Sequence, residues 1–137
     1  MAHSIEIKVR GYHLDLFHHV NNARYLEFLE EARWSFLEHK GGSDSLDFLE
    51  RHSYVFAIVN ININYRRAAY MGEILLINTS IKSVSDRSFV MYQSVVLKGT
   101  DTMVSDADVT IVIMDTRTER SVPLDGELRT SLERMVD

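Results

Sequence analysis

The feature that most constrains the fold is a series of strand-like segments in the second half of the chain. The first segment begins apolar and then alternates strictly, so that Ile61 and Ile63 are flanked by asparagines. Three more segments follow, each after a short turn-like stretch. The four segments comprise residues 54–67, 73–84, 88–98 and 103–115. Consecutive strands joined by short turns predict an antiparallel meander.

One strand and one long helix precede these segments. Residues 4–12 alternate apolar and charged side chains and include Gly11, which predicts a fifth strand. A helix is predicted from Asn22 to Lys40, because apolar residues recur there at helical spacing. We assign its buried side to Tyr25, Leu29, Ala32 and Phe36, widened by Leu26, Phe28 and Leu37, and its charged side to Glu27, Glu30, Glu31 and Arg33. Trp34 is most simply a core residue as well, although a groove beside the helix could hold an acyl chain. One such helix can cover one face of a five-stranded sheet, so we expect an α+β fold in which the sheet wraps around it.

Length and composition narrow the class of protein. The 137 residues fit a single domain spanning 1–137, and the absence of cysteine gives no sign of a disulfide framework or of secretion. No apolar run approaches the roughly 20 residues that span a membrane. A formal net charge of −5 argues against a nucleic-acid-binding protein. We therefore expect a cytoplasmic protein, and the long strands favour a homodimer because an open edge strand is otherwise a hazard.

The loop between the first strand and the helix, residues 12–22, holds the candidate chemistry. It places Asp15 at the end of the sheet, shortly before the exposed backbone N–H groups of the helix start. A carboxylate beside such groups has the minimum equipment for acyl transfer to water. The same residues also fit a plain turn and helix cap, and spacing alone leaves that alternative open. A metal site at His13, His18 and His19 is disfavoured, because their spacing matches no standard ligand pattern.

The string DLFHHVNNARY at residues 15–25 resembles the D-x-x-G-H-V-N-N-x-x-Y signature of hotdog-fold acyl-CoA thioesterases of the 4-hydroxybenzoyl-CoA thioesterase type. The resemblance runs nearly the full length of the chain. NINYRRAAYMGE is similar to the family's second strand and following turn, DRSFVMYQSV to its Arg/Lys-Ser-Phe hairpin, and SDADVTIVIMD to its last strand. The combination of HVNNARYLEFLEEARW, VNININYRR and LDGELR is most similar to bacterial members that act on long-chain acyl-CoA.

The resemblance implies roles for individual residues. Asp15 falls on the aspartate that acts as nucleophile or general base, and the backbone N–H near Asn22 falls where the thioester carbonyl is polarised. His19 and Asn21 would orient these groups, and His18 replaces the family glycine. The residues implied to bind the substrate and its coenzyme A are Tyr25, Arg66, Arg67, Arg87 and Ser88. Arginine suits a phosphate group because its planar fork can donate two parallel hydrogen bonds.

The implied function is hydrolysis of long-chain fatty acyl-CoA to free fatty acid and coenzyme A by a cytoplasmic homodimer or homotetramer. The resemblance implies no metal or prosthetic group as cofactor, since coenzyme A is part of the substrate, and no nucleic-acid or membrane partner. Two alternatives remain: an aroyl- or short-chain acyl-CoA thioesterase, and a non-catalytic protein that binds acyl thioesters. A hydratase of the same fold is disfavoured, because the chain lacks the D-x-N-P-x-H motif.

Overall fold

One antiparallel sheet and one long helix make up most of the molecule. The computed structural model describes residues 3–136, apart from the side chains of residues 42–46. The strands are β1 His3–Lys8, β2 Tyr54–Tyr65, β3 Ile74–Val84, β4 Phe89–Leu97, β5 Met103–Asp115 and the two-residue β6 Arg120–Ser121. The α-helices are α1 Asn22–Phe36, α2 Gly42–Arg51 and α3 Gly126–Arg134. All five predicted strands and the predicted central helix are therefore present.

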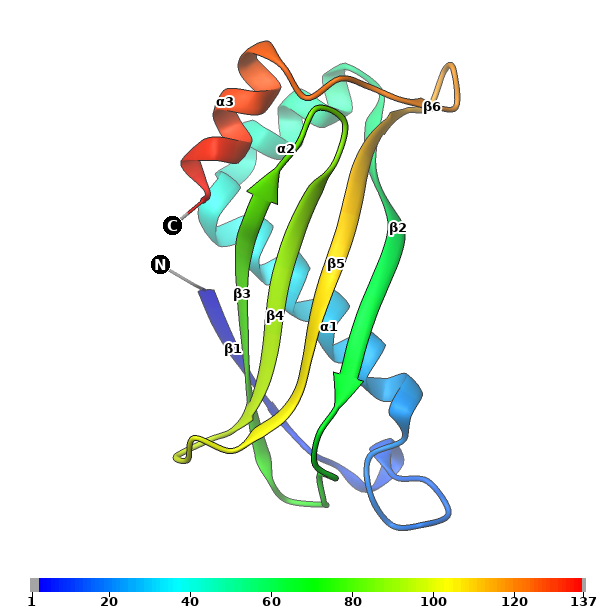
Figure 1. The fold of residues 1–137 in the computed structure, drawn as a ribbon, viewed down its shortest axis with the longest axis vertical. Helices are drawn as coiled ribbons and strands as arrows, with labels where there is room; N and C mark the ends of the chain where they lie inside the picture. The colour runs from blue at the N-terminus through cyan, green and yellow to red at the C-terminus, as the bar shows by residue number, and fades with distance from the viewer. Residues whose placement is uncertain (1–2, 137) are drawn as a thin grey trace.

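The strand order differs from a simple meander. The five long strands lie in the order β1-β3-β4-β5-β2, and every neighbouring pair is antiparallel. The predicted meander is correct for β3, β4 and β5 but wrong for β2, which pairs with β5 at one edge of the sheet (Figure 1). Residues 66–73 carry the chain past two strands to β3, a span of about 14 Å at ordinary strand spacing. The turn-like composition of this segment gave no sign that it crosses the end of the sheet.

The core lies between the sheet and α1. Inward-facing residues alternate with outward-facing ones along β5, and Val109, Ile111 and Ile113 are buried on the side of the helix. The helix contributes the fully buried Leu29 and Phe36. Behind the sheet, α1 runs diagonally (Figure 1), and its contacts with the sheet are mostly with β1 and β3. The predicted α+β architecture is confirmed, but the helix leaves part of the inner face beside β2 uncovered.

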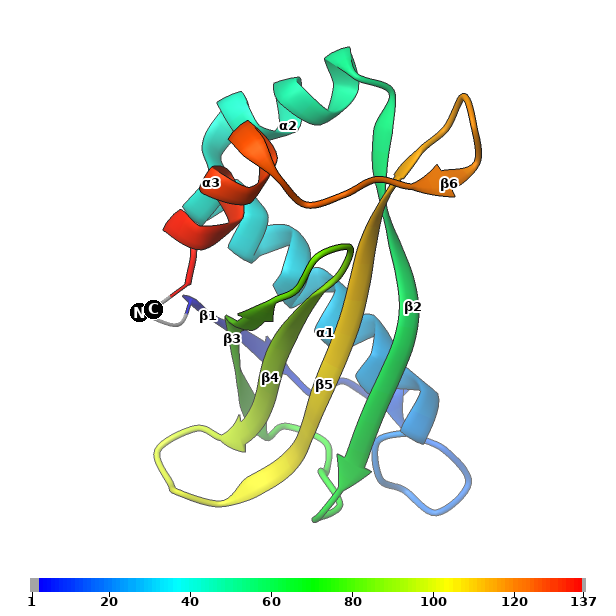
Figure 2. The same cartoon turned by 45° about the horizontal axis from the view of Figure 1, so that its top comes forward.

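The C-terminal end of the long helix differs from the prediction. The α-helix ends at Phe36 and continues as a single wide π-helical turn over Leu37–Gly41, after which α2 begins at once. The predicted helix over Asn22–Lys40 is therefore confirmed as a continuous helical stretch, although its last turn is π-helical and Gly41-Gly42 do not stop the chain from continuing into α2. Figure 2 shows α2 and α3 together at one end of the sheet, with the loop before α1 at the other. Among residues 3–136, the structure contains no helix long and apolar enough to cross a membrane.

Candidate active site

The loop before α1 is a tight turn built by its own hydrogen bonds. The Asp15 N–H donates to the His19 carbonyl at 3.0 Å, and the His18 N–H donates to the Asp15 carbonyl at 3.1 Å. His18 adopts a φ of 66°, in the left-handed region that favours glycine and that histidine tolerates better than most residues. This backbone conformation explains why the family signature has glycine at the position of His18.

The carboxylate of Asp15 is fixed by the same turn. Its Oδ1 accepts a hydrogen bond from the Phe17 N–H at 2.9 Å, while its Oδ2 lies 3.8 Å from the His19 Nδ1. The Asp15 side chain is 23% exposed, so it remains accessible to a ligand. One carboxylate oxygen is thus held by the backbone, and the other is directed toward the imidazole.

Asn21 is the cap of α1. Its Oδ1 accepts a hydrogen bond from the Ala23 N–H at 2.9 Å, which satisfies one of the free amides of the first helical turn. The Asn22 N–H is another of these amides, and it donates no hydrogen bond to residues 3–136. The helix dipole adds partial positive charge at the same point. The start of α1 therefore offers a hydrogen-bond donor for negative charge on a ligand.

Asp15 and the helix start share one cavity of about 470 Å³. Tyr65, at the end of β2, donates its hydroxyl hydrogen to the Asn22 carbonyl at 3.0 Å and closes one side. Tyr25 lies beneath, buried, and burial raises the pKa of its phenol to about 12, which keeps it protonated. The cavity is lined by Asp15, His19, Val20, Asn22, Tyr25, Tyr65, Arg66, Arg67 and Ala68. A carbonyl group placed here would lie between a carboxylate and an exposed amide.

The arginines of this cavity are already paired with carboxylates. Arg66 donates from Nε and Nη2 to the two carboxylate oxygens of Asp106 at 3.1 and 3.2 Å. Arg67 makes a two-pronged pair with Glu73, both bonds 2.9 Å long, and its guanidinium holds the pKa of the Glu73 carboxyl below its usual value. Both guanidinium groups would have to share or exchange these partners to bind a phosphate. Their role toward coenzyme A stays a prediction.

Arg87 and Ser88 lie at the other end of the sheet from Asp15. They belong to the hairpin between β3 and β4, on the side of α2 and α3 (Figure 1). Arg87 donates from Nη1 to the Ser121 carbonyl at 3.0 Å and remains exposed. Within one chain, the structure therefore does not bring Arg87 and Ser88 together with Asp15.

The sequence of this chain is similar to those of known proteins. A family model described as the thioesterase-like superfamily matches residues 9–132. The chain belongs to the thioesterase-like superfamily. It is 48% identical over 131 residues to the long-chain acyl-CoA thioesterase FadM of Escherichia coli strain K12, which covers 96% of this chain and 97% of that protein. The recognition of this family from the loop motif is confirmed.

Solved structures of other proteins share the fold of this chain. YbaW, a probable thioesterase from Escherichia coli, superposes with a TM-score of 0.90 at 47% identity and 98% coverage of both chains. A mutant of 4-hydroxybenzoyl-CoA thioesterase, solved with 4-hydroxybenzoyl-CoA, superposes with a TM-score of 0.85 at 20% identity, covering 96% of this chain and 98% of that one. The second likeness concerns the fold alone. The predicted hotdog fold is thus confirmed, and thioester hydrolysis is the activity of the superfamily to which the chain belongs.

A second cavity lies on the inner face beside β2, where α1 leaves the sheet uncovered. It measures about 690 Å³ and its walls are largely apolar. Trp34, which the sequence analysis assigned to the core, is 50% exposed at this cavity. Arg33, which was assigned to the charged solvent face, is only 8% exposed and also lines it. Both assignments were wrong, because the helix is covered by the sheet on the side of β1 and β3 and open on the side of β2.

The helical spacing held a signal for Arg33 that the sequence analysis missed. Arg33 lies four residues after Leu29 and three before Phe36, so it falls on the buried stripe of the helix. Tyr65 was placed in phase with Ile61 and Ile63 but was not predicted as a site residue. For Arg33, residue type was given more weight than position.

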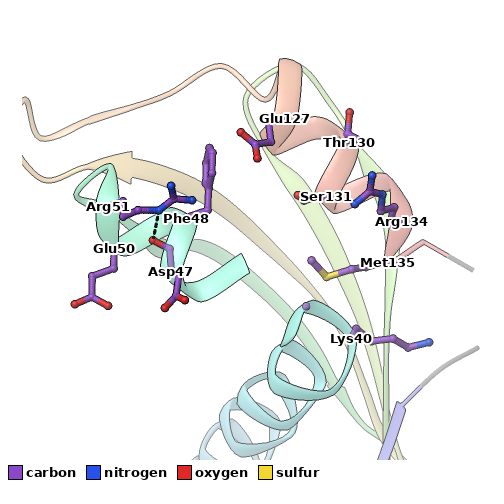
Figure 3. Close-up of a pocket in the computed structure, with 11 residues that line it drawn as sticks. Lys40, Asp47, Phe48, Glu50, Arg51, Glu127, Thr130, Ser131, Arg134 and Met135 are labelled. Carbon is purple, nitrogen blue, oxygen red and sulfur yellow. Dashed lines mark hydrogen bonds between the residues drawn. The ribbon is translucent and has the colours of Figure 1, made fainter. Parts of the chain in front are cut away.

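A third cavity of about 950 Å³ opens between α2 and α3 (Figure 3). Charges of both signs line it, among them Asp47, Arg51, Glu127 and Arg134, and the Arg51 Nε donates to the Asp47 carbonyl at 3.4 Å. A lining with charges of both signs does not favour one class of ligand. Within the described part of the chain, no group of three or more His, Asp or Glu side chains could hold a metal ion.

Proposed function

We propose that this protein hydrolyses long-chain fatty acyl-CoA to a free fatty acid and coenzyme A. The observation that most directly supports this proposal is that Asp15 and the Asn22 end of α1 line one cavity. The identity of 48% to a protein named long-chain acyl-CoA thioesterase supports the chain length. The chain's own residues suffice for the reaction as we propose it, with no metal or prosthetic group.

In the proposed reaction the thioester carbonyl oxygen accepts a hydrogen bond from the Asn22 N–H. Asp15 either removes a proton from the attacking water or attacks the carbonyl carbon itself, in which case water then hydrolyses the resulting acyl-aspartyl anhydride and regenerates the Asp15 carboxylate. Negative charge then develops on the carbonyl oxygen, where the amide and the helix dipole stabilise it. The carbon–sulfur bond breaks, coenzyme A leaves as a thiolate and takes up a proton, and the oxygen of water ends in the carboxylate of the fatty acid. His19 would orient the carboxylate of Asp15, from which its Nδ1 lies 3.8 Å away.

We further propose that the working form is a homodimer joined at β2. This strand pairs only with β5 among the described residues, and its free edge carries the exposed Val55, Ile58 and Val59. Antiparallel pairing of two copies of β2 would bring the far end of one sheet to the Asp15 end of the other. The partner subunit's Arg87 would then approach this Asp15 cavity, which the Arg87 of the same chain does not reach. There the partner subunit's Arg87 could bind the phosphates of coenzyme A. A homotetramer would be a pair of such dimers.

The activity is tested by incubating the purified protein with palmitoyl-CoA and a thiol-reactive dye. We expect thiol release well above the background rate, and no release would contradict the proposal. A panel of acyl-CoA esters from acetyl to stearoyl, together with 4-hydroxybenzoyl-CoA, tests the substrate class. Activity that is highest with short or aromatic acyl groups would favour the alternative thioesterase, and binding without hydrolysis would favour the non-catalytic alternative.

The dimer is tested by light scattering on a sizing column. Val59→Asp places a charge at the free edge of β2 and should give monomers with reduced activity, whereas Ser83→Asp, an exposed position on β3, should leave the dimer intact. A wild-type monomer with full activity would contradict this part of the proposal. A cytoplasmic location belongs to the same proposal, because the protein carries no cysteine and acyl-CoA esters are made inside cells.

A further inference from the structure

The cavity beside β2 has a largely apolar wall that also includes one buried arginine and two exposed glutamates, Glu30 and Glu50. It lies between the C-terminal half of α1, the end of α2 and β2, and holds about 690 Å³. Its inner wall is formed by side chains of the sheet and the helix: Trp34, Leu37, Phe56, Ile58, Phe89 and Met91. Walls of this kind suit a hydrocarbon chain. The arginine is Arg33, a residue of which only 8% of the surface is exposed.

Arg33 is held by one neutral partner. Its Nη1 donates to the Gln93 Oε1 at 3.1 Å. Gln93 is fully buried and is fixed in turn, because its Nε2 donates to the Leu29 carbonyl at 2.9 Å and to the Thr79 Oγ1 at 3.0 Å. The Arg33 Nε and Nη2 make no hydrogen bond to residues 3–136. None of the ion pairs among those residues includes Arg33.

Burying a cation is destabilising unless its charge is compensated. Burial lowers the pKa of Arg33, and the negative charge of Glu30 opposes this shift without hydrogen-bonding to the guanidinium. Arginine nevertheless stays charged at neutral pH. A carboxylate placed in the cavity would be a hydrogen-bonded anionic partner and would accept from the donors that Gln93 leaves free. The fork geometry of the guanidinium favours this planar anion over other acceptors.

The carboxylate is best carried by the acyl chain itself. Glu30 and Glu50 also line the cavity and are exposed, so a free anion arriving from solvent would meet two negative charges, whereas a carboxylate on an acyl chain is held there by the burial of the chain's methylene groups as well. Arg33 lies eleven residues beyond Asn22 on α1, which is about 16 Å along the helix axis. An extended chain of about 13 carbons covers this distance at roughly 1.3 Å per carbon, the axial projection of a carbon–carbon bond. Leu26, one helical turn after Asn22 on the same side of the helix, is 41% exposed and offers apolar surface.

We propose that this cavity receives the far end of a long acyl chain and that Arg33, positioned by Gln93, binds a carboxylate carried there. The ligand class is the coenzyme A monothioester of a long-chain dicarboxylic acid. The inference rests on the proposed function, because the thioester end of the same chain must occupy the cavity at Asp15.

The first test uses the wild-type protein alone. We measure kcat/KM for hexadecanedioyl-CoA and palmitoyl-CoA, and for the shorter pair octanedioyl-CoA and octanoyl-CoA. We then divide kcat/KM for the dicarboxylic ester by kcat/KM for the plain ester. This ratio should be about tenfold higher for the long pair than for the short pair, because only the long chain reaches Arg33. Tenfold is the factor expected from one charge-assisted hydrogen bond. A ratio that stays constant or falls with chain length would overturn the inference, since an apolar cavity alone rejects a terminal carboxylate.

The second test changes the charged group. Arg33→Met should lower the long-chain ratio by about tenfold, and Arg33→Lys should restore part of it. Arg120→Met, at an exposed position on β6, is the matched control and should leave the ratio unchanged. An unchanged ratio in Arg33→Met would overturn the inference. If Arg33→Met does not fold by circular dichroism, the chain-length dependence of the wild type decides.

The two proposals fail in different ways. If the wild type releases no thiol from any of the four esters, the proposed function fails and this inference falls with it. If palmitoyl-CoA is hydrolysed but the ratio does not depend on chain length, only the role of Arg33 is wrong.

Discussion

The two ends of α1 are built in different ways. At the N-terminal end, Asp15 and Asn21 make hydrogen bonds to residues only two positions away. At the C-terminal half, Arg33 depends on Gln93, which is 60 residues away in sequence. The first end is therefore specified by a short local motif, and the second exists only when helix and sheet have come together.

The charges at the two ends also differ. Arg66 and Arg67 beside the Asp15 cavity each have a carboxylate partner within the chain. Among the described residues, the neutral Gln93 is the only hydrogen-bonding partner of Arg33, and Glu30 acts on it through charge alone. A charge whose hydrogen bonds are already satisfied gains little from a ligand, whereas a buried charge with free donors gains more. The proposed chemical step and the proposed recognition of the acyl chain therefore lie at opposite ends of one helix. The predictions below address each end in turn.

The largest effect is expected at the N-terminal end. Asp15→Asn should lower kcat for palmitoyl-CoA by about 100-fold or more, the usual contribution of a general base or nucleophile. The asparagine oxygen can still accept the bond from the Phe17 N–H, so the turn should be preserved. Thiol release and circular dichroism measure the two properties. A variant as fast as the wild type would remove Asp15 from the reaction.

The next effect concerns the stability of the C-terminal half. Gln93→Met removes the only hydrogen-bonding partner of Arg33 among the described residues and should lower the free energy of unfolding by about 3 kcal/mol. Urea denaturation measures this loss. The double variant Gln93→Met with Arg33→Met should lose less than the sum of the two single variants, because the unpaired charge is gone. Strict additivity would show that the two side chains do not act together.

A smaller effect is expected from the helix cap. Asn21→Ala removes the acceptor for the Ala23 N–H and should lower the free energy of unfolding by about 1 kcal/mol. Asn21→Ser keeps a capping oxygen and should restore both stability and activity. If serine restores stability but not the rate of palmitoyl-CoA hydrolysis, Asn21 has a role in the reaction beyond capping.

The smallest effect is a pH dependence near the same loop. His13 is buried, and its Nδ1 accepts a hydrogen bond from the Arg10 N–H at 2.9 Å. Burial, followed by the positive charge of Arg24, lowers the pKa of His13 below 6.5. The folded protein therefore binds this proton less readily than the unfolded chain, and its stability should decrease as the pH falls below 6.5.

This dependence is measured as the change in Tm between about pH 7.5 and pH 5.5, where histidine titrates. His13→Asn provides an uncharged acceptor in place of Nδ1 and should show a smaller decrease in Tm over that range. An equal decrease in both proteins would mean that His13 contributes nothing to it, leaving His3, whose pKa is also lowered, as the source.

Much of the fold and of the Asp15 end could be predicted from sequence. The strand β5 was predicted with the bounds it has, Met103–Asp115, because its inward and outward residues alternate without interruption. Asn21 and Asn22 were predicted at the helix start because capping is a local preference. The left-handed turn at His18 is anticipated by the glycine that the family signature carries there.

The sequence alone determined the elements, because hydrophobic periodicity marks both helices and strands, and the loop before α1, because hydrogen bonds between near neighbours shape its turn and cap. Only the tertiary structure decided that β2 pairs with β5 at the sheet edge, that Arg66 meets Asp106, and that Arg33 is buried against Gln93. The partners in the last two pairs are 40 and 60 residues apart. Such contacts depend on strand order and on the angle at which the helix crosses the sheet, and the local periodicity of a chain encodes neither.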